Sequence, residues 1–261
     1  MIFLSDQGQD EYINLLAQGH GYEITDSRNF RYEDSDQPIV LRGILKYKLM
    51  RQCWKDNRTF FYIDSGYFGN SPNPLNPRGH KHWHRIVKND IQHSDIRSVP
   101  NDRWRKLCIE FEPRKHGKKI IVAAPDEKPG KFYDIDVEAW LHATLNTLSS
   151  YTDRPIEVRQ RSKSRQHRTI SDPLSKVLED DVHALVTFNS NAAVESILKG
   201  VPAFVLAPVH AAKPVSNSDL QHIENPYWPS YDKLYAWANS LAHGQFHIDE
   251  FRQGQVLKHL I

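Results

Sequence analysis

Cysteine is scarce in this sequence, and long apolar runs are missing. Only two cysteines, Cys53 and Cys108, occur among 261 residues, which excludes a disulfide framework and a zinc site built from cysteines. So few cysteines are typical of a reducing compartment, and we expect a cytoplasmic location. The longest nearly uninterrupted apolar stretch, residues 201–209, contains two prolines and is far too short to cross a bilayer. Residues 1–20 lack the basic and apolar segments of a secretory signal, so we predict no membrane span and no export.

The net charge is also small. Thirty-four Lys and Arg residues stand against 32 Asp and Glu residues, giving a formal charge of +2. This balance excludes a uniformly polycationic protein, but it averages over an uneven distribution. Basic residues are concentrated between Arg154 and Arg168, whereas acidic residues are spread over the rest of the chain.

Apolar periodicity alternates between strand and helix along both halves of the chain. This alternation is typical of α/β proteins with parallel sheets. We predict two Rossmann-like doubly wound domains facing a cleft, over residues 1–110 and 111–261, with the closing helix packing back on the first domain. The expected strands are 1–6, 22–25, 59–64, 81–88, 119–124, 155–159, 184–188 and 203–207; the expected helices are 9–18, 39–54, 137–148, 174–178, 191–198 and 231–242, with a polar loop at 125–130.

The strongest local signal is the segment 187–204, in which a buried strand turns through small polar residues into a helix. Ser190 precedes the helix and Asn191 begins it; the unpaired amides and dipole at this end favour an anion such as phosphate. Glu195 follows in the first turn, where a carboxylate can accept hydrogen bonds from ribose hydroxyls. The structural alternative is that Ser190 or Asn191 caps the helix while Glu195 complements its dipole.

This strand, the Ser-Asn-Ala-Ala-x-Glu helix start and the following Lys-Gly-Val-Pro resemble the donor-binding half of two-Rossmann-domain (GT-B) glycosyltransferases. The likeness is greatest to capsule-sugar transferases and to glycosyltransferase-like proteins of tailed bacteriophages, and it covers about residues 118–245. It implies that Glu195 binds the nucleotide ribose, with Ser190 and Asn191 near the diphosphate. It also implies a second donor-side loop at 213–219, which contains Ser216. The co-substrate would be a nucleotide sugar, UDP-linked, with no cofactor and no metal; a phage-encoded protein would act in the host cytoplasm.

The basic run supplies the second signal. Arg159 and Arg161 alternate on one face of a predicted strand and can neutralise a departing diphosphate. Lys128 lies at the same carboxyl edge, where it is a further donor contact. Three residues of the loop that follows can track a nucleic-acid backbone, namely Lys163, Arg165 and Arg168. The alternative is a solvated basic loop.

In the first half, Asp64 ends a predicted strand and is the first candidate for the base that deprotonates an acceptor hydroxyl. His84 is the second candidate, and Tyr67 is placed to stack on a sugar or a base. His80, His82 and His84 share one face of a strand, but no carboxylate or cysteine stands at ligand spacing, so we expect no metal.

The sequence therefore predicts an enzyme, a glycosyltransferase that moves a sugar from a nucleotide-sugar donor to an acceptor hydroxyl. The acceptor is a hydroxymethylated pyrimidine in double-stranded phage DNA or a glycan. Two alternatives stay open: a nucleotide-sugar epimerase on the same fold, and a non-catalytic nucleic-acid-binding protein.

Overall fold

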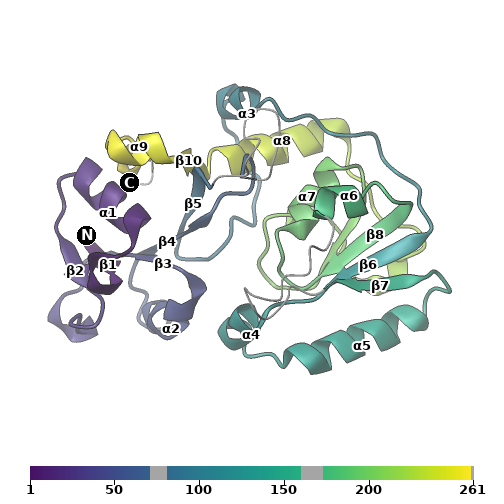
Figure 1. Cartoon of the computed structure of the whole chain (residues 1–261), viewed down its shortest axis with the longest axis horizontal. Helices are drawn as coiled ribbons and strands as arrows, with labels where there is room; N and C mark the ends of the chain where they lie inside the picture. Colours follow the sequence, from purple (N-terminus) through teal and green to yellow (C-terminus); the bar gives the residue numbers. More distant parts are fainter. Residues whose placement is uncertain (71–80, 160–172, 260–261) are drawn as a thin grey trace. The chain divides into compact units, whose positions relative to one another are not determined.

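The computed structural model describes residues 1–70, 81–159 and 173–259 of the chain. The chain divides into two compact units, which Figure 1 shows with their elements labelled. Unit 1 comprises Met1–His93, Pro100–Leu107 and Asn239–Ile261; unit 2 comprises Ser94–Val99 and Cys108–Ala238. Unit 1 thus takes its last segment from the C-terminal end of the chain, beyond the predicted boundary at residue 110.

Unit 1 contains a mixed sheet of six strands in the order β10-β5-β4-β3-β1-β2. Strands β1, β2, β3 and β4 pair in parallel, whereas β5 runs antiparallel to both β4 and β10. The elements are β1 (Ile2–Ser5), α1 (Glu11–Gly19), β2 (Ile24–Asp26), β3 (Ile39–Arg42), α2 (Tyr47–Lys55), β4 (Phe60–Ser65), β5 (Trp83–Lys88), α3 (Asp102–Leu107), β10 (Gln245–His247) and α9 (Ile248–Arg252).

Helices cover both faces of this sheet, as parallel strands require. One core cluster joins α1 and α9 to alternate residues of the strands, including Phe3, Val40, Phe61 and Phe246. In Figure 1, α2 lies on the opposite face of β3 and β4 from α1 and α9. Unit 1 is therefore doubly wound over its parallel part.

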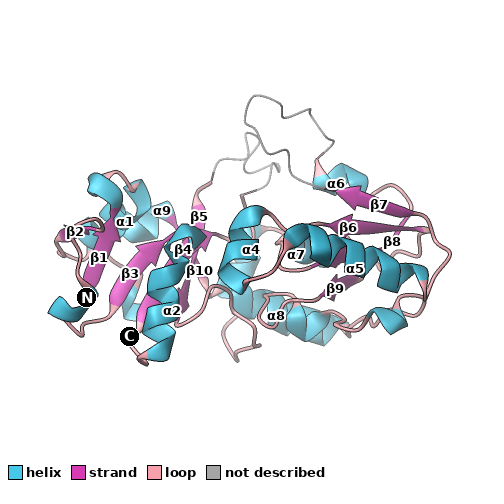
Figure 2. Cartoon of the chain, turned by 90° about the horizontal axis from the view of Figure 1, so that it is seen from below, coloured by secondary structure: helices cyan, strands magenta, loops and turns pink. Residues whose placement is uncertain are grey.

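Unit 2 contains a wholly parallel sheet of four strands in the order β7-β6-β8-β9. Its core cluster packs Leu148 of α5 against Val122, Val186 and Phe204, and Figure 2 shows the helices that accompany the strands. The elements are β6 (Lys119–Ala123), α4 (Glu127–Tyr133), α5 (Val137–Ser149), β7 (Ile156–Arg159), α6 (Leu174–Val177), β8 (Val182–Thr187), α7 (Ala192–Leu198) and β9 (Ala203–Val205). Helix α8 (Tyr231–Ala242) begins in unit 2, and its last residues, from Asn239, belong to unit 1. The predicted α/β class with parallel sheets is confirmed.

Two predicted elements differ in the structure. Residues 39–54 are not one helix: β3 forms first, and Gly43, with φ of 84°, separates it from α2. A short apolar run is compatible with the spacing of a helix and with that of a strand. Ile39, Val40 and Leu41 are all completely buried, which favours a strand because successive residues of a central strand are covered on both faces of the sheet. Residues 125–130 are not all loop, because α4 begins at Glu127; Pro129 is accommodated in the first turn, where an amide donor is not needed. Across the described ranges, no helix combines the length and apolar character that a membrane crossing requires.

Gly200 ends α7 as predicted, and its backbone offers a stability test. Its φ is 73°, and a Cβ there would lie 2.0 Å from the carbonyl oxygen of Pro113. Gly21 has a similar φ of 71° but open space around it. We expect Gly21→Ala to cost about 1 kcal/mol from φ alone and Gly200→Ala about 3 kcal/mol or more, because the backbone must also move. Urea unfolding checks this, and equal losses would contradict it.

Candidate functional site

The carboxyl edge of the unit 2 sheet gathers most of the predicted donor residues. The strand register aligns Arg159 of β7 with Ala123 of β6, Ala123 with Thr187 of β8, and Thr187 with Val205 of β9. All four strands therefore end at one level. The strand order reverses between β6 and β8, so this is the switch point where open α/β sheets bind ligands.

The loop after β8 is held in place by buried hydrogen bonds. The Thr187 hydroxyl donates to the Ala123 carbonyl at 2.8 Å, which ties β8 to β6 at their ends. His210, which follows β9 and is completely buried, accepts the Ala212 amide at Nδ1 (2.9 Å). Its Nε2 therefore carries the proton and donates to the Ser190 carbonyl at 3.0 Å. This neutral histidine joins the loops that follow two adjacent strands.

The predicted donor residues lie at different depths around this edge. Ser190 is half-buried, and its hydroxyl accepts the amide of Ala192, the first residue of α7, at 3.2 Å; the N-cap position of the helix is occupied by Asn191. Asn191 is half-buried beside it, and Glu195 is half-buried within α7. Lys128 is exposed in the first turn of α4, directly after β6.

Ser216 lies away from this row. It precedes Asn217, which forms a parallel bridge with Phe204 in the middle of β9 rather than at its end. The Ser216 hydroxyl oxygen is buried and has no hydrogen-bond partner within the described residues. The structure therefore brings Ser190, Asn191, Arg159 and Lys128 to one edge, with Ser216 beside the last strand.

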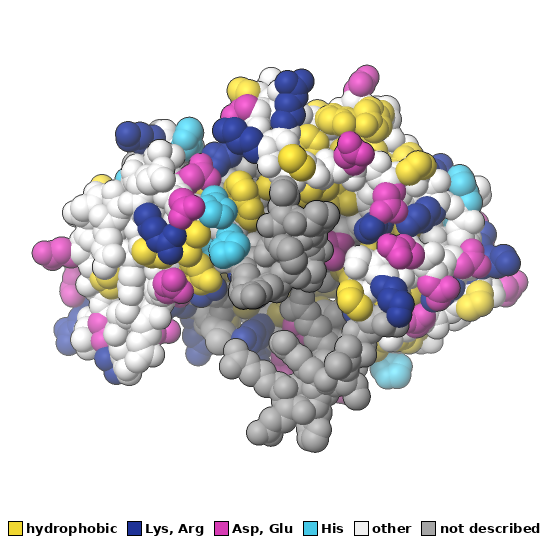
Figure 3. Space-filling model, turned by 45° about the horizontal axis from the view of Figure 1, so that its top comes forward, with side chains coloured by type: hydrophobic (Ala, Val, Ile, Leu, Met, Phe, Trp, Pro, Cys, Tyr) yellow, Lys and Arg dark blue, Asp and Glu magenta, His cyan; other side chains and the backbone are white. Residues whose placement is uncertain are grey.

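The basic run is described only at its beginning. Arg159, at the end of β7, is half-buried. Arg161, Lys163, Arg165 and Arg168 lie outside the described residues. On the described part of the face in Figure 3, basic and acidic side chains are interspersed.

At the carboxyl edge of unit 1, the switch point lies between β1 and β3. Asp10 caps α1 there, accepting the amides of Tyr12 and Ile13, and forms an ion pair with Arg42 at 3.3 Å. The Arg42 guanidinium lies 4.5 Å from the centre of the Tyr12 ring. Tyr12 also packs against His84, with ring centroids 3.8 Å apart, so its ring is fixed between two side chains.

Asp64 lies on β4 at the same edge, with its carboxylate engaged. The Tyr62 hydroxyl donates to it at 2.8 Å, and Arg85, nearly buried, forms an ion pair with it at 3.2 Å. Burial alone would raise the pKa of Asp64, but the Arg85 charge and the hydrogen bonds from Tyr62 and the Ser65 amide outweigh it and lower the pKa. The group is therefore ionised but weakly basic.

His84 and Tyr67 are buried. His84 is 0% exposed, and burial followed by the Arg42 charge lowers its pKa to about 4, so the ring is neutral near pH 7. The Tyr67 hydroxyl accepts the His93 amide at 2.9 Å, and its backbone amide donates to Gln245. Tyr67 is 5% exposed, which leaves little of its ring for stacking.

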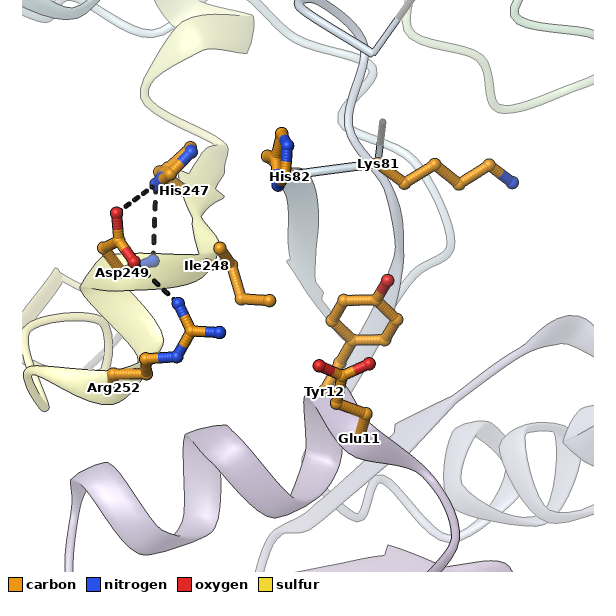
Figure 4. Close-up of a pocket in the computed structure, with 8 residues that line it drawn as sticks. All are labelled: Glu11, Tyr12, Lys81, His82, His247, Ile248, Asp249 and Arg252. Carbon is orange, nitrogen blue, oxygen red and sulfur yellow. Dashed lines mark hydrogen bonds and ion pairs between the residues drawn. The ribbon is translucent and has the colours of Figure 1, made fainter. Parts of the chain in front are cut away.

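A pocket of about 400 Å³ at this edge was not singled out from the sequence (Figure 4). It includes His82, whereas His80 lies outside the described residues. His82 and His247 come together because β10 pairs antiparallel with β5, a contact between distant parts of the chain that local periodicity does not reveal. The residues that line the pocket are Glu11, Tyr12, Lys81, His82, His247, Ile248, Asp249 and Arg252. Within the described ranges, no three His, Cys, Asp or Glu side chains are grouped to hold a metal.

No family model and no curated protein matches this sequence. Among solved structures, the chain is similar to KpsC of Thermosulfurimonas dismutans, a beta Kdo 2,4 transferase, at 10% identity and a TM-score of 0.44. The similarity covers 77% of this chain and 78% of that one. With so few identical residues and so low a TM-score, this likeness does not establish a shared activity.

The neutral state of His84 has a consequence for stability. The pKa of this histidine is 6.5 in the unfolded chain and about 4 in the folded chain. Between these pH values the unfolded chain therefore binds a proton that the folded chain does not bind. Wild-type stability should therefore fall by about 3 kcal/mol through this group as the pH drops across that window. His84→Leu removes this contribution, so the difference between the two proteins in unfolding free energy should change steadily from pH 6.5 to 4. Curves that stay parallel in urea titrations would refute this assignment.

Proposed function

We propose that the chain is a glycosyltransferase that moves a sugar from a nucleotide-sugar donor, UDP-linked, to an acceptor hydroxyl. Unit 2 would bind the donor. The observation that supports this most is the carboxyl edge of its parallel sheet, where strand ends in register meet a loop of small polar residues at the switch point.

The residues at this edge suit a nucleotide diphosphate. Ser190 and Asn191 are half-buried and have short side chains, so a ligand can approach the backbone of these two residues, whereas Ala192 and Ala193 are buried. The His210 hydrogen bond fixes the Ser190 carbonyl and so reduces the ordering that binding would cost. Lys128 and Arg159 bring positive charge to the same edge, where it would stabilise the diphosphate as it leaves. Glu195 would accept hydrogen bonds from the ribose.

The acceptor hydroxyl would belong to a hydroxymethylated pyrimidine in phage DNA or to a glycan. Lys163, Arg165 and Arg168 would track a DNA backbone in the first case. Asp64 and His84 are the two candidates from the sequence for the general base that deprotonates the acceptor hydroxyl. The ion pair with Arg85 makes Asp64 a weak base, and complete burial keeps His84 out of reach of a substrate.

Calorimetry with a panel of nucleotides and nucleotide sugars tests donor binding. Glu195→Ala should weaken the binding of the preferred nucleotide sugar ten- to a hundredfold, because a charged hydrogen bond is worth about 1.5–3 kcal/mol. Glu179→Ala is the matched control: Glu179 is an exposed glutamate of the same unit that precedes β8, at the opposite edge of the sheet. The control should bind as the wild type does.

The absence of binding by any nucleotide or nucleotide sugar would reject the transferase proposal. Equal binding by the two variants would reject the role of Glu195 alone. A mass increase on hydroxymethylated duplex DNA, but not on unmodified DNA, would identify DNA as the acceptor; binding to duplex DNA should then weaken steeply with salt.

A further inference from the structure

The loop after β9 contains a lysine whose charge is not paired with a carboxylate. Lys213 is exposed, and its ammonium donates a hydrogen bond to the Pro208 carbonyl. Lys119 and Lys199, by contrast, each contact two carboxylates of unit 2. Among the described residues, no Asp or Glu forms an ion pair with Lys213. Its positive charge is therefore open to an anionic ligand.

The loop keeps this charge at the carboxyl edge of the unit 2 sheet. Strand β9 ends at Val205, and the Lys213 side chain reaches back to Pro208, shortly beyond that end. The chain then turns along the strand, because Asn217 forms a bridge in the middle of β9. Of the loop 213–219 expected from the sequence, Lys213 is thus the residue whose side chain reaches the edge.

Buried side chains hold the backbone that carries Lys213. His210 is completely buried and joins this loop to the one after β8, through its hydrogen bond to the Ser190 carbonyl. Trp237 of α8 is also completely buried, and its Nε1 donates to the Ala211 carbonyl at 2.7 Å. A hydrogen bond in the interior is stronger than one exposed to water. The loop is therefore ordered before a ligand arrives, which lowers the entropic cost of binding.

The carbonyl oxygens of this loop are all occupied. Each carbonyl from residue 208 to residue 212 accepts a hydrogen bond. The donors are two backbone amides and three side chains, namely those of Lys213 and Val215, and those of Lys213, Tyr133 and Trp237. A carbonyl oxygen carries a partial negative charge, so an unpaired one beside a phosphate would repel it. With its carbonyls directed to these donors, the loop is suited to border an anion.

We propose that Lys213 binds the diphosphate of the nucleotide-sugar donor, and that Trp237, together with His210, positions it by fixing the loop 208–212. This inference deepens the proposed function and rests on it. A lysine ammonium is a compact charge with three donors, so it can bond to the loop carbonyl and to phosphate oxygens at once. The contact would distinguish a nucleoside diphosphate from the nucleoside alone.

The first test uses the full chain, the nucleoside diphosphate that binds best in calorimetry, and the matching nucleoside, followed by ligand-observed NMR. Lys213→Gln removes the charge and keeps a polar side chain. We expect the Kd of the diphosphate to rise about ten- to a hundredfold, because a hydrogen bond to a charged group is lost. The Kd of the nucleoside should stay within about twofold. Lys118→Gln is the matched control, since Lys118 is an exposed lysine just before β6, at the opposite edge of the sheet.

The second test concerns the positioning role of Trp237. Trp237→Phe keeps a large aromatic side chain but leaves the Ala211 carbonyl without its indole donor. We expect the Kd of the diphosphate to rise about three- to tenfold, with that of the nucleoside unchanged. Trp54→Phe is the control, because it removes a hydrogen bond of the same kind, from Trp54 Nε1 to the Asn89 carbonyl, in unit 1. It should bind both ligands as the wild type does.

Wild-type affinity of Lys213→Gln for the diphosphate would overturn the inference. An equal loss of affinity for the nucleoside would overturn it too, because it would show a general effect on the fold. Wild-type affinity of Trp237→Phe for the diphosphate would reject its positioning role. Failure of every nucleotide and nucleotide sugar to bind to the wild-type chain would instead reject the proposed function itself.

Discussion

Parallel strand pairing is the constraint on which the rest of this structure depends. Parallel neighbours need long crossover connections, and the helices in those connections bury both faces of a sheet. Polar side chains are then confined mainly to the strand ends. In unit 2 the four strands end in register, at Arg159, Ala123, Thr187 and Val205, and the chain continues from there into loops. The location of the candidate sites is thus a consequence of the pairing, whatever ligand they hold.

The two edges nevertheless differ in chemistry. In unit 2, a buried histidine, His210, joins two loops through the Ser190 carbonyl and the Ala212 amide. In unit 1, the reversal of β5 and β10 brings the start of one strand beside the end of another, and two histidines line an open pocket.

The sequence predicts the parallel α/β units well, because buried strands such as 182–187 and helices such as 137–149 carry strong periodicity. It fails where local pattern is ambiguous: Ile39–Arg42 fits helix and strand spacing alike. It places Ser190 and Arg159 at one edge because carboxyl ends of parallel strands coincide. The position of His247 is not predicted from the sequence, because a three-residue strand that pairs with β5 far upstream leaves no local signal. The burial of His84 is not predicted either, because it depends on Tyr12 of α1 packing against it.

The central claim is that a nucleotide binds at the carboxyl edge of the unit 2 sheet. Hydrogen–deuterium exchange, with and without a saturating nucleotide sugar, tests it most directly. A bound nucleotide should slow exchange at residues 188–193 and 208–213, the loops that His210 joins, and should change β7 and α5 little at their far ends. Protection confined to unit 1, or none in these two loops while the ligand is bound, would contradict it.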